Sequence, residues 1–398
     1  MRIKSKVKKV ISKSIKLVYK LLYKYIPVDK KMVLFISFHG KGYICNPKYI
    51  HEYMSNNEKF NEYRFIWAIK SKYTVKVPGS KVVRYNSIAY YYYLARSKYW
   101  IVNYKLPYYI MKKSNQVYLQ TWHGTPLKRL AHDIVEKDNM TFYRSEMSRS
   151  EMLNTYDTDV KKYNYLLSPN RFSTEKFISA FKVDREKIIE EGYPRVDFLL
   201  NVLNTDVIRI KEKYGIPLNK KVILYAPTWR DNSYNNKGYS YNIEVDFEKW
   251  RKILGDEYVV IFKPHYLIID NYNNEGLEEF VYIMKENIDI NELYIVSDIL
   301  ITDYSSVFFD YAVLKRPILF YMYDLEEYRD ELRGFYLDIN KDLPGPIYTV
   351  EDELLKYITN IEKYSSNLIN NISLFNRKFN FLQDGRSAER IVKMVFDN

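Results

Sequence analysis

Histidines follow three of the predicted β-strands at the same end. His39, His123 and His265 each stand just past the carboxyl end of a short apolar run. Ligands of open parallel α/β sheets bind at that edge, and a histidine there can take up or release a proton near neutral pH. A single histidine in a loop is more often a structural hydrogen-bonding residue. Three at equivalent edges favour a functional site.

Basic side chains lie at the same predicted edge. Lys128 follows the second of these histidines, Arg230 follows the predicted strand at 221–226, and Lys263 shortly precedes the third histidine. Each alone is more typical of a solvated surface charge, but together they suit the pyrophosphate of a nucleotide diphosphate. No two histidines have the spacing of a zinc site, so we expect no metal ion.

Residues 298–306 have the pattern of a strand followed by a hydroxyl-rich turn. The apolar run at 298–302 predicts a buried parallel strand, and Ser305 or Ser306 can begin the helix predicted at 307–316. Free backbone N–H groups and serine hydroxyls at the mouth of such a βαβ unit suit phosphate binding. A capped helix in any α/β protein would have the same pattern, so this stretch alone leaves both interpretations open.

The remaining elements must bring these edges together. Strands and helices alternate over residues 32–200 and again over 201–370, which predicts an α/β protein with two consecutive domains and a cleft between them. Residues 371–398 predict a C-terminal helix that packs back across the domains. Thr125 and Pro126 are typical of a helix start, with threonine as the N-cap and proline at the first helical position.

Composition and missing motifs exclude several protein classes. With 398 residues, 47% hydrophobic and 28% charged, the chain is typical of a globular protein with two domains. It lacks the phosphate loop of P-loop NTPases, the glycine fingerprint of dinucleotide oxidoreductases and the G-x-S-x-G elbow. Asp157-Thr158-Asp159 lies in a polar stretch and is too short a pattern to indicate a metal site. Cys45 is the only cysteine, which fits a reducing cytoplasm.

Positive charge is concentrated in residues 1–31, which contain eleven basic residues and one acidic residue. The rest of the chain holds 51 basic and 48 acidic residues, which argues against broad nucleic-acid binding. The segment predicts a basic amphipathic helix on an anionic membrane surface. A helix docked on the protein's own core is the alternative. The apolar residues at three- and four-residue steps are Ile3, Val7, Ile11, Ile15, Val18, Leu22 and Tyr25.

Six motifs in one order resemble the CDP-glycerol glycerophosphotransferases of teichoic-acid and related capsule synthesis. The resemblance covers about residues 32–395, and ribitol-phosphate transferases share the same motifs. A further segment at 384–390 also resembles that family. The motifs are Gln120 to Lys128, Ser168-Pro169-Asn170, Gly192 to Arg195, Ala226 to Arg230, Phe262 to His265, and Asp298 to Ser306 with Asp310.

The resemblance implies a GT-B-like fold of two Rossmann-like domains, with CDP-glycerol held by the C-terminal one. It implies that no cofactor or metal is needed. It also implies an undecaprenyl-diphosphate-linked saccharide as acceptor and peripheral attachment to the cytoplasmic face of the membrane, in agreement with the pattern of residues 1–31. A homo-oligomer is compatible with it, and nucleic acid is not an expected partner.

The resemblance also suggests a mechanism and a set of site residues. An acceptor hydroxyl attacks the β-phosphorus of CDP-glycerol and CMP leaves, with His123 as the base. His265 contacts the pyrophosphate, although the two histidines could exchange these roles. Asp303 positions the site. The residues expected to bind donor or phosphate are Thr228, Arg230, Lys263, Thr302, Ser305, Ser306 and Lys128.

Three other functions fit parts of the pattern. A CDP-ribitol-dependent transferase keeps the mechanism and changes the donor. A GT-B glycosyltransferase that uses a nucleotide sugar fits the fold equally well, and only the motif set argues against it. A basic protein that only binds membranes or nucleic acid is the third, and the near-neutral body of the chain argues against it.

Overall fold

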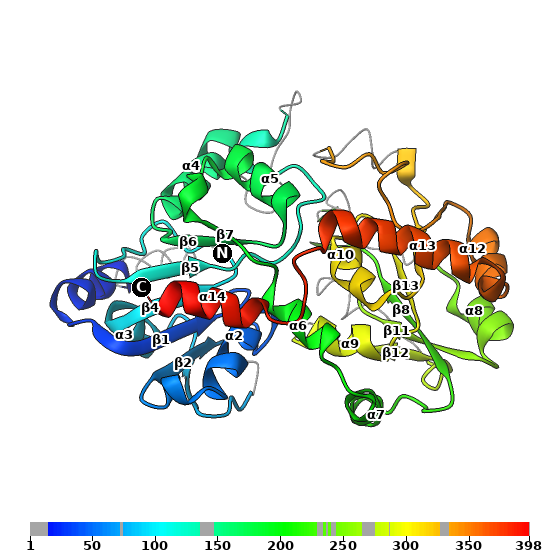
Figure 1. Ribbon diagram of the computed structural model, residues 1–398, viewed down its shortest axis with the longest axis horizontal. Helices are drawn as coiled ribbons and strands as arrows, with labels where there is room; N and C mark the ends of the chain where they lie inside the picture. Colours follow the sequence, from blue (N-terminus) through cyan, green and yellow to red (C-terminus); the bar gives the residue numbers. More distant parts are fainter. Residues whose placement is uncertain are drawn as a thin grey trace.

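Two parallel sheets, each covered by helices, form two lobes that lie side by side (Figure 1). The structure is a computed structural model that describes residues 15–71, 75–135, 147–228, 244–264, 275–285, 287–326 and 334–397, together with the backbone of 234–235 and 238–239. The two-domain α/β fold expected from the alternating pattern is present.

The N-terminal sheet has seven strands in the order β3-β2-β1-β4-β5-β6-β7. Its central strands are almost continuously buried, as expected for a parallel sheet with helices on both faces. The strand order reverses between β1 and β4, and ligands bind at such switch points. The strands are β1 (Asp29–Ile36), β2 (Arg64–Ile69), β3 (Ser80–Arg84), β4 (Ser97–Val102), β5 (Val117–Gln120), β6 (Tyr165–Ser168) and β7 (Ile188–Glu190).

The C-terminal sheet has six strands in the order β12-β11-β8-β13-β14-β15, and it reverses between β8 and β13. A short antiparallel pair, β9 (Tyr234–Asn235) and β10 (Gly238–Tyr239), lies outside it. The strands of the sheet are β8 (Lys221–Ala226), β11 (Tyr258–Phe262), β12 (Val281–Ile283), β13 (Ile299–Thr302), β14 (Ile318–Tyr321) and β15 (Ile347–Tyr348).

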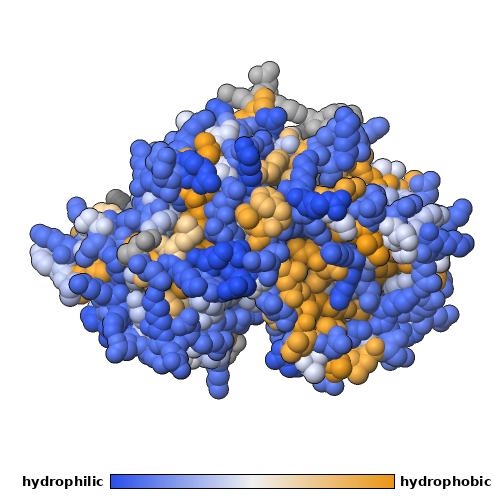
Figure 2. Space-filling view, in the orientation of Figure 1, coloured by the Kyte–Doolittle hydropathy of each residue, from blue (hydrophilic) through white to orange (hydrophobic). Residues whose placement is uncertain are grey.

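Helices cover both sheets. Most of the face seen in Figure 2 is polar, and apolar side chains gather over α9 beside the junction of the lobes. The α-helices are α2 (Cys45–Ser55), α3 (Ile88–Arg96), α4 (Arg149–Val160), α5 (Arg171–Phe181), α6 (Pro194–Leu200), α7 (Asn204–Lys213), α8 (Phe247–Leu254), α9 (Ile290–Val296), α10 (Val307–Tyr311), α12 (Glu351–Ile358), α13 (Ile361–Phe379) and α14 (Ser387–Phe396).

The last two helices belong to different lobes. Helix α13 packs on the C-terminal sheet through Ile372 and Phe375, whereas α14 packs into the N-terminal core through Ile391 and Val395. Figure 1 shows α14 lying over the first lobe. The Asp197 carboxylate accepts hydrogen bonds from the first backbone N–H groups of α14, at 3.0 and 2.7 Å, a favourable place for negative charge. The chain therefore returns to its first lobe at its end.

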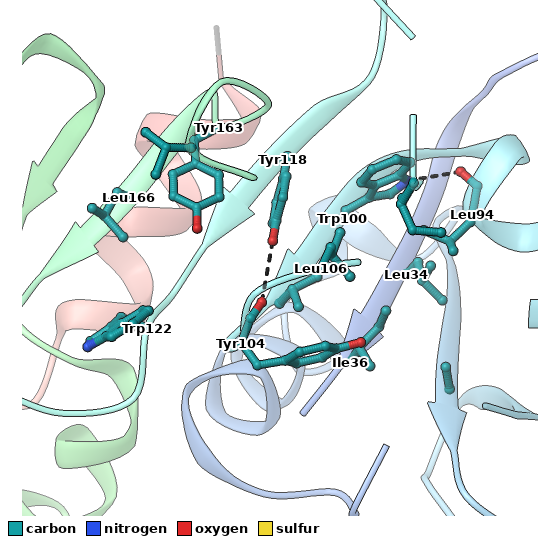
Figure 3. Packing of buried hydrophobic residues seen from close by; sticks show 14 of the residues in the cluster. Leu34, Ile36, Leu94, Trp100, Tyr104, Leu106, Tyr118, Trp122, Tyr163 and Leu166 are labelled. Atoms are coloured by element: carbon teal, nitrogen blue, oxygen red, sulfur yellow. Dashed lines mark hydrogen bonds between the residues drawn. The ribbon is translucent and has the colours of Figure 1, made fainter. Parts of the chain in front are cut away.

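Aromatic side chains fill the N-terminal core on the face that carries α3 (Figure 3). Trp100 is buried, and its Nε1 donates to the carbonyl of Leu94 at 3.0 Å. The hydroxyl of buried Tyr118 lies 3.5 Å from the carbonyl of Tyr104. These rings contribute apolar area while their polar atoms keep partners. Trp122 packs in the same cluster and so anchors the residue after it.

The helix expected to begin at Thr125 and Pro126 is absent, and that prediction was wrong. The segment instead crosses to the C-terminal lobe, where Leu127 is buried in the core. The Arg129 N–H donates to the Gly334 carbonyl at 3.0 Å, and the Tyr336 N–H donates to the Leu127 carbonyl at 2.9 Å. Burial of Leu127 and backbone pairing with residues 334–336 outweigh the local pattern of a helix start.

The N-terminal segment is described only in part. Residues 15–25 are helical, and residues 1–14 lie outside the described residues. Buried Tyr19 docks this helix on the N-terminal lobe, where its ring meets Tyr91 and its hydroxyl donates to the Met111 carbonyl at 2.5 Å. The alternative of docking on the protein's own core therefore holds for this part, and the membrane-surface helix over 1–31 stays a prediction. Within the described residues, no helix has the length and apolar character needed to cross a membrane.

Candidate active site

His123 lies at the carboxyl edge of the N-terminal sheet, just beyond β5. Its Nδ1 is 2.7 Å from the backbone carbonyl of Asn103. Because a carbonyl only accepts hydrogen bonds, Nδ1 carries the hydrogen and Nε2 is the basic nitrogen. The Trp122 ring stacks on the imidazole with centroids 4.5 Å apart, and Phe38 approaches it edge-on at 5.5 Å. The ring is thus held in one orientation and one tautomer.

The surroundings keep His123 neutral. Its side chain reaches solvent, but the crowding around it lowers its pKa to about 4, mainly by desolvation. The Arg195 guanidinium lowers the pKa further, and the Asn103 carbonyl opposes the shift. The histidine is therefore unprotonated at neutral pH, and its Nε2 is free of hydrogen.

Buried amides hold the loop that carries His123. Trp122 adopts a left-handed backbone conformation with φ of +49°, which is uncommon for a large side chain. Its N–H donates to Gln120 Oε1 at 3.0 Å, and Asn46 Nδ2 donates to the Thr121 carbonyl at 3.1 Å. Strained backbone kept in place by such contacts is common at functional sites.

His39 lies near His123 and shares its electrostatic environment. It follows β1, and its ring centroid is 3.9 Å from that of Tyr104. Burial lowers its pKa to about 4, and the charges of nearby basic groups, including His123, lower it further. Two of the three histidines picked out at strand ends are thus neighbours in space.

Three lysines near His39 were missed by the sequence reasoning. Lys70, Lys41 and Lys105 all contribute to lowering the pKa of His39. Lys105 donates to Thr155 Oγ1 at 2.6 Å, and burial lowers its own pKa to about 8. Each lysine follows the carboxyl end of a strand, β1, β2 or β4. Applying the strand-end rule to every basic residue would have found them.

Hydroxyls and a carboxylate join β8 and β13 at the corresponding edge of the C-terminal sheet. The buried Thr302 hydroxyl donates to the Ala226 carbonyl at 2.8 Å. The buried Asp303 carboxylate accepts from the Thr228 N–H at 2.8 Å and from the Thr228 hydroxyl. Both threonine hydroxyls have partners within the protein, so their expected contact with donor phosphate stays a prediction. Asp303 fixes the geometry of the two strand ends.

The serine turn lies against the His123 loop. Ser305 and Ser306 are half-buried, and Ser306 occupies the N-cap position of α10. Among the described contacts of α10, its hydroxyl makes no capping hydrogen bond. A Cβ atom at Gly124 would lie 2.9 Å from Ser306 Oγ, so the two segments are in close contact and a side chain here would displace the serine hydroxyl. The structure therefore brings together two motifs that are almost two hundred residues apart.

The structure describes two of the four remaining site residues, Lys128 and Lys263. Lys128 lies on the segment that crosses between lobes and pairs with Phe335. Lys263 follows β11, where its N–H donates to the Tyr225 carbonyl at 2.9 Å and its Nζ donates to the Lys285 carbonyl. His265 and Arg230 lie outside the described residues, so their roles stay predictions.

Two further family motifs meet at the junction of the lobes. Arg195 Nε is 2.7 Å from one carboxylate oxygen of Asp310, and Arg195 Nη2 is 3.0 Å from the other. Both side chains are buried. Arg195 Nη1 also contacts Cys45 Sγ at 3.4 Å. This ion pair fixes α10, and with it the serine turn, relative to the N-terminal lobe.

The short Asp-x-Asp pattern has structural partners. Asp157 Oδ1 is 2.7 Å from Nε2 of His132, and buried Asp159 accepts from the hydroxyl of Tyr163 at 3.0 Å. In the part of the chain that the structure describes, no group of three His, Cys, Asp or Glu side chains is arranged to hold a metal ion.

Residues 17–397 match the family described as CDP-glycerol:poly(glycerophosphate) glycerophosphotransferase. The chain belongs to this family. The family resemblance seen in the six motifs is thereby confirmed.

Individual relatives agree with this assignment. The chain is 43% identical over 405 residues to a teichoic acid poly(glycerol phosphate) polymerase of Bacillus subtilis (strain 168), which covers 99% of the chain but 53% of the relative. The chain thus spans about half the length of that relative. It is 40% identical over 399 residues to a teichoic acid glycerol-phosphate transferase of Staphylococcus aureus (strain NCTC 8325), covering 99% of the chain and 100% of the relative.

A solved structure of the wall teichoic acid polymerase TagF has the same fold. It superposes with a TM-score of 0.89 at 39% identity, covering 98% of this chain and 95% of that one. The expected GT-B-like fold is therefore confirmed.

Proposed function

We propose that this protein transfers glycerol phosphate from CDP-glycerol to a hydroxyl of a lipid-linked teichoic-acid acceptor and releases CMP. The observation that carries the proposal is the position of His123, an oriented and neutral imidazole whose next residue, Gly124, packs against Ser306 of the other lobe. Membership of the glycerophosphotransferase family supports the choice of reaction. A site with a base on one lobe and phosphate-binding groups on the other suits phosphoryl transfer, which depends mainly on positioning and charge stabilisation.

In the proposed step, His123 acts as the general base. The acceptor oxygen forms a bond to the β-phosphorus of CDP-glycerol while its proton moves to Nε2 of His123. The bond between the β-phosphorus and the bridging oxygen breaks, and CMP leaves with that oxygen. A bound pyrophosphate would raise the pKa of His123, because nearby negative charge favours the imidazolium form.

Groups on the C-terminal lobe would bind the donor. Ser305 and Ser306 would donate to phosphate oxygens, and Lys263 and Arg230 would neutralise phosphate charge. His265 would stabilise or protonate the leaving CMP, and exchange of roles between the two histidines is the alternative. Asp303 would keep the strand ends in place. Thr228, Thr302 and Lys128 complete the set, and the reaction would need no metal ion or cofactor.

The acceptor would approach from the N-terminal lobe. We infer an undecaprenyl-diphosphate-linked saccharide as its class, met at the cytoplasmic face of the membrane by a peripherally bound protein. Lys41, Lys70 and Lys105 offer positive charge near His39 and would suit the phosphates of such an acceptor.

The test is donor choice. The purified protein is incubated with CDP-glycerol, CDP-ribitol or a panel of UDP- and GDP-sugars, each with a lipid-linked disaccharide, and released nucleotide and product mass are measured. CMP from CDP-glycerol, with glycerol phosphate added to the acceptor, supports the proposal. One added unit indicates a priming enzyme, and a ladder indicates a polymerase. Release of CMP from CDP-ribitol alone, or of UDP or GDP from a sugar donor, would show that the protein uses a different donor and would contradict the proposal.

A further inference from the structure

A pocket of about 370 Å³ opens at the amino-terminal edge of the N-terminal sheet. Arg64 at the start of β2, Lys81 near the start of β3 and Arg96 at the end of α3 line it. His123 follows the carboxyl end of β5 in the same sheet. A strand length of roughly 20 Å therefore separates the pocket from the candidate active site.

Positive charge exceeds negative charge around this pocket. Arg64 forms an ion pair with Asp29, and Arg96 Nη2 lies 3.6 Å from the same carboxylate. Asp29 thus faces two arginines, and Lys81 adds a third cation. Glu62, which also lies near β2, is paired with a lysine outside the pocket. The pocket would attract an anion.

Tyrosines complete the wall. Arg96 Nη1 donates to the Tyr92 hydroxyl at 2.8 Å, which orients its guanidinium. Lys81 Nζ lies 5.4 Å from the centre of the Tyr93 ring. Guanidinium groups bind phosphate oxygens through paired hydrogen bonds, and tyrosine hydroxyls can add others. The volume lies at the small end of the ~300–1,000 Å³ range of ligand sites, so it suits a headgroup-sized anion.

The pocket shares α3 with the docked N-terminal helix. Tyr91 of α3 contacts Tyr19 of that helix. Leu17 and Leu21 of the helix are exposed, at 61% and 51%, and Lys20 stands between them. This is the pattern of a segment that meets an anionic lipid surface, and the pocket lies on the same part of the lobe.

We propose that this pocket binds a small phosphate ester, held by Arg64, Lys81 and Arg96. The group would come from the headgroup of an anionic lipid or from a soluble phosphate ester, because the two share this chemistry. The proposal goes beyond the transferase reaction and does not depend on it.

Binding of two probes to the full chain tests the proposal. Glycerol 3-phosphate is titrated by calorimetry, and vesicles of phosphatidylglycerol or of phosphatidylcholine are used in flotation. We expect Arg64→Gln/Lys81→Gln to weaken binding of at least one anionic probe about tenfold, as for the loss of a charge-assisted contact. Lys98→Gln and Arg171→Gln, which change a half-buried and an exposed basic residue outside the pocket, serve as matched controls. Thermal melting of every variant checks that the fold is kept.

The pattern of losses identifies the source of the ligand. Loss with phosphatidylglycerol vesicles alone assigns the pocket to a lipid headgroup, and loss with glycerol 3-phosphate alone assigns it to a soluble ligand. Equal binding by the pocket variant and the controls would overturn the proposal, as would no binding of either probe by the wild type. CMP release from CDP-glycerol is measured in parallel, so failure of the transferase proposal is seen separately.

Discussion

Arg195 and Asp310 meet across the junction of the two lobes in a buried, bidentate ion pair. Arg195 lies at the start of α6 and Asp310 lies on α10, directly behind the serine turn. Asn291 Nδ2 also donates to the backbone carbonyl of Arg195 at 2.5 Å. Since both charges are removed from water, each requires the other. The pair thereby sets the distance between the His123 loop and the serine turn.

Breaking this pair should destabilise the protein strongly. Asp310→Asn leaves the Arg195 guanidinium buried without its counter-charge, and we expect the free energy of unfolding to fall by about 3–5 kcal/mol. Urea unfolding measures the loss. The control is Asp206→Asn, which removes an exposed pair with Arg209 and should cost less than about 1 kcal/mol. An equal effect of the two variants would contradict the role given to the buried pair.

Replacing His123 should abolish most turnover without unfolding the protein. His123→Gln removes the proton acceptor, and we expect kcat/KM for CMP release to fall by about 10²–10⁴-fold. His132→Gln, which changes a half-buried histidine paired with Asp157, is the matched control. A His123→Gln variant with full turnover would exclude the base assignment.

The lowered pKa of His123 predicts a shifted pH profile. In the free protein the His123 imidazole is neutral above its lowered pKa of about 4, whereas an ordinary histidine would lose this form below about pH 6.5. We expect kcat/KM to stay level from pH 7 down to about pH 5 and to fall only below that. An acidic limb centred near pH 6.5 would show that the ring is not desolvated in the working enzyme.

Buried His51 should make stability depend on pH. Its ring contacts the hydroxyls of Tyr43 at 2.8 Å and Ser80 at 2.7 Å, and burial lowers its pKa to about 4. The unfolded histidine gains a proton near pH 6.5 and the folded one does not, so its contribution is present above about pH 6.5 and is lost as pH falls toward 4.

The measurement is the urea midpoint of wild type and His51→Gln between pH 7.5 and 4.5. The difference between the two proteins should shrink as pH falls. Comparing variants is necessary because Asp159 and Asp197, whose pKa values burial raises to about 6, act in the opposite direction. A constant difference across this range would contradict the prediction.

The close approach of Gly124 and Ser306 predicts a steric effect that can be reversed. Gly124→Ala places a methyl group 2.9 Å from Ser306 Oγ, which forces the hydroxyl out of its position, and we expect a loss of about 1 kcal/mol in stability. Adding Ser306→Ala should restore part of it, because the Ser306 Cβ is 3.7 Å away. Gly42→Ala is the control, since its new methyl group meets its nearest neighbour at 3.6 Å. Thermal melting measures both variants. If the double variant melts at the same temperature as Gly124→Ala, the contact with Ser306 is not the cause of the lost stability.

The two-domain fold could be predicted because apolar runs mark buried parallel strands directly. The run at 298–302 became β13 over Ile299–Thr302. The helix predicted at Thr125 failed because its local pattern carries no sign of the partner segment at 334–336. The pairing of Arg195 with Asp310, 115 residues apart, is likewise invisible to local reasoning.

Only part of the candidate site could be predicted, because a local pattern does not show which distant residues meet. His123 and the serine turn could be proposed from their places after strands, and their proximity across the lobes needed the structure. The Asn103 carbonyl that sets the tautomer of His123 has no signal in the sequence, because every residue has a carbonyl group.

Helix α14 has a consequence for synthesis on the ribosome. Chains emerge from the N-terminus, and domains usually fold as they appear. Here the first lobe to emerge still lacks Ile391 and Val395, which complete its core, until the second lobe has been translated. Until then, the apolar surface that α14 covers would be exposed to solvent on the newly made first lobe, and a chaperone could bind there. Docking of α14 covers this apolar surface and thereby ends the exposed stage.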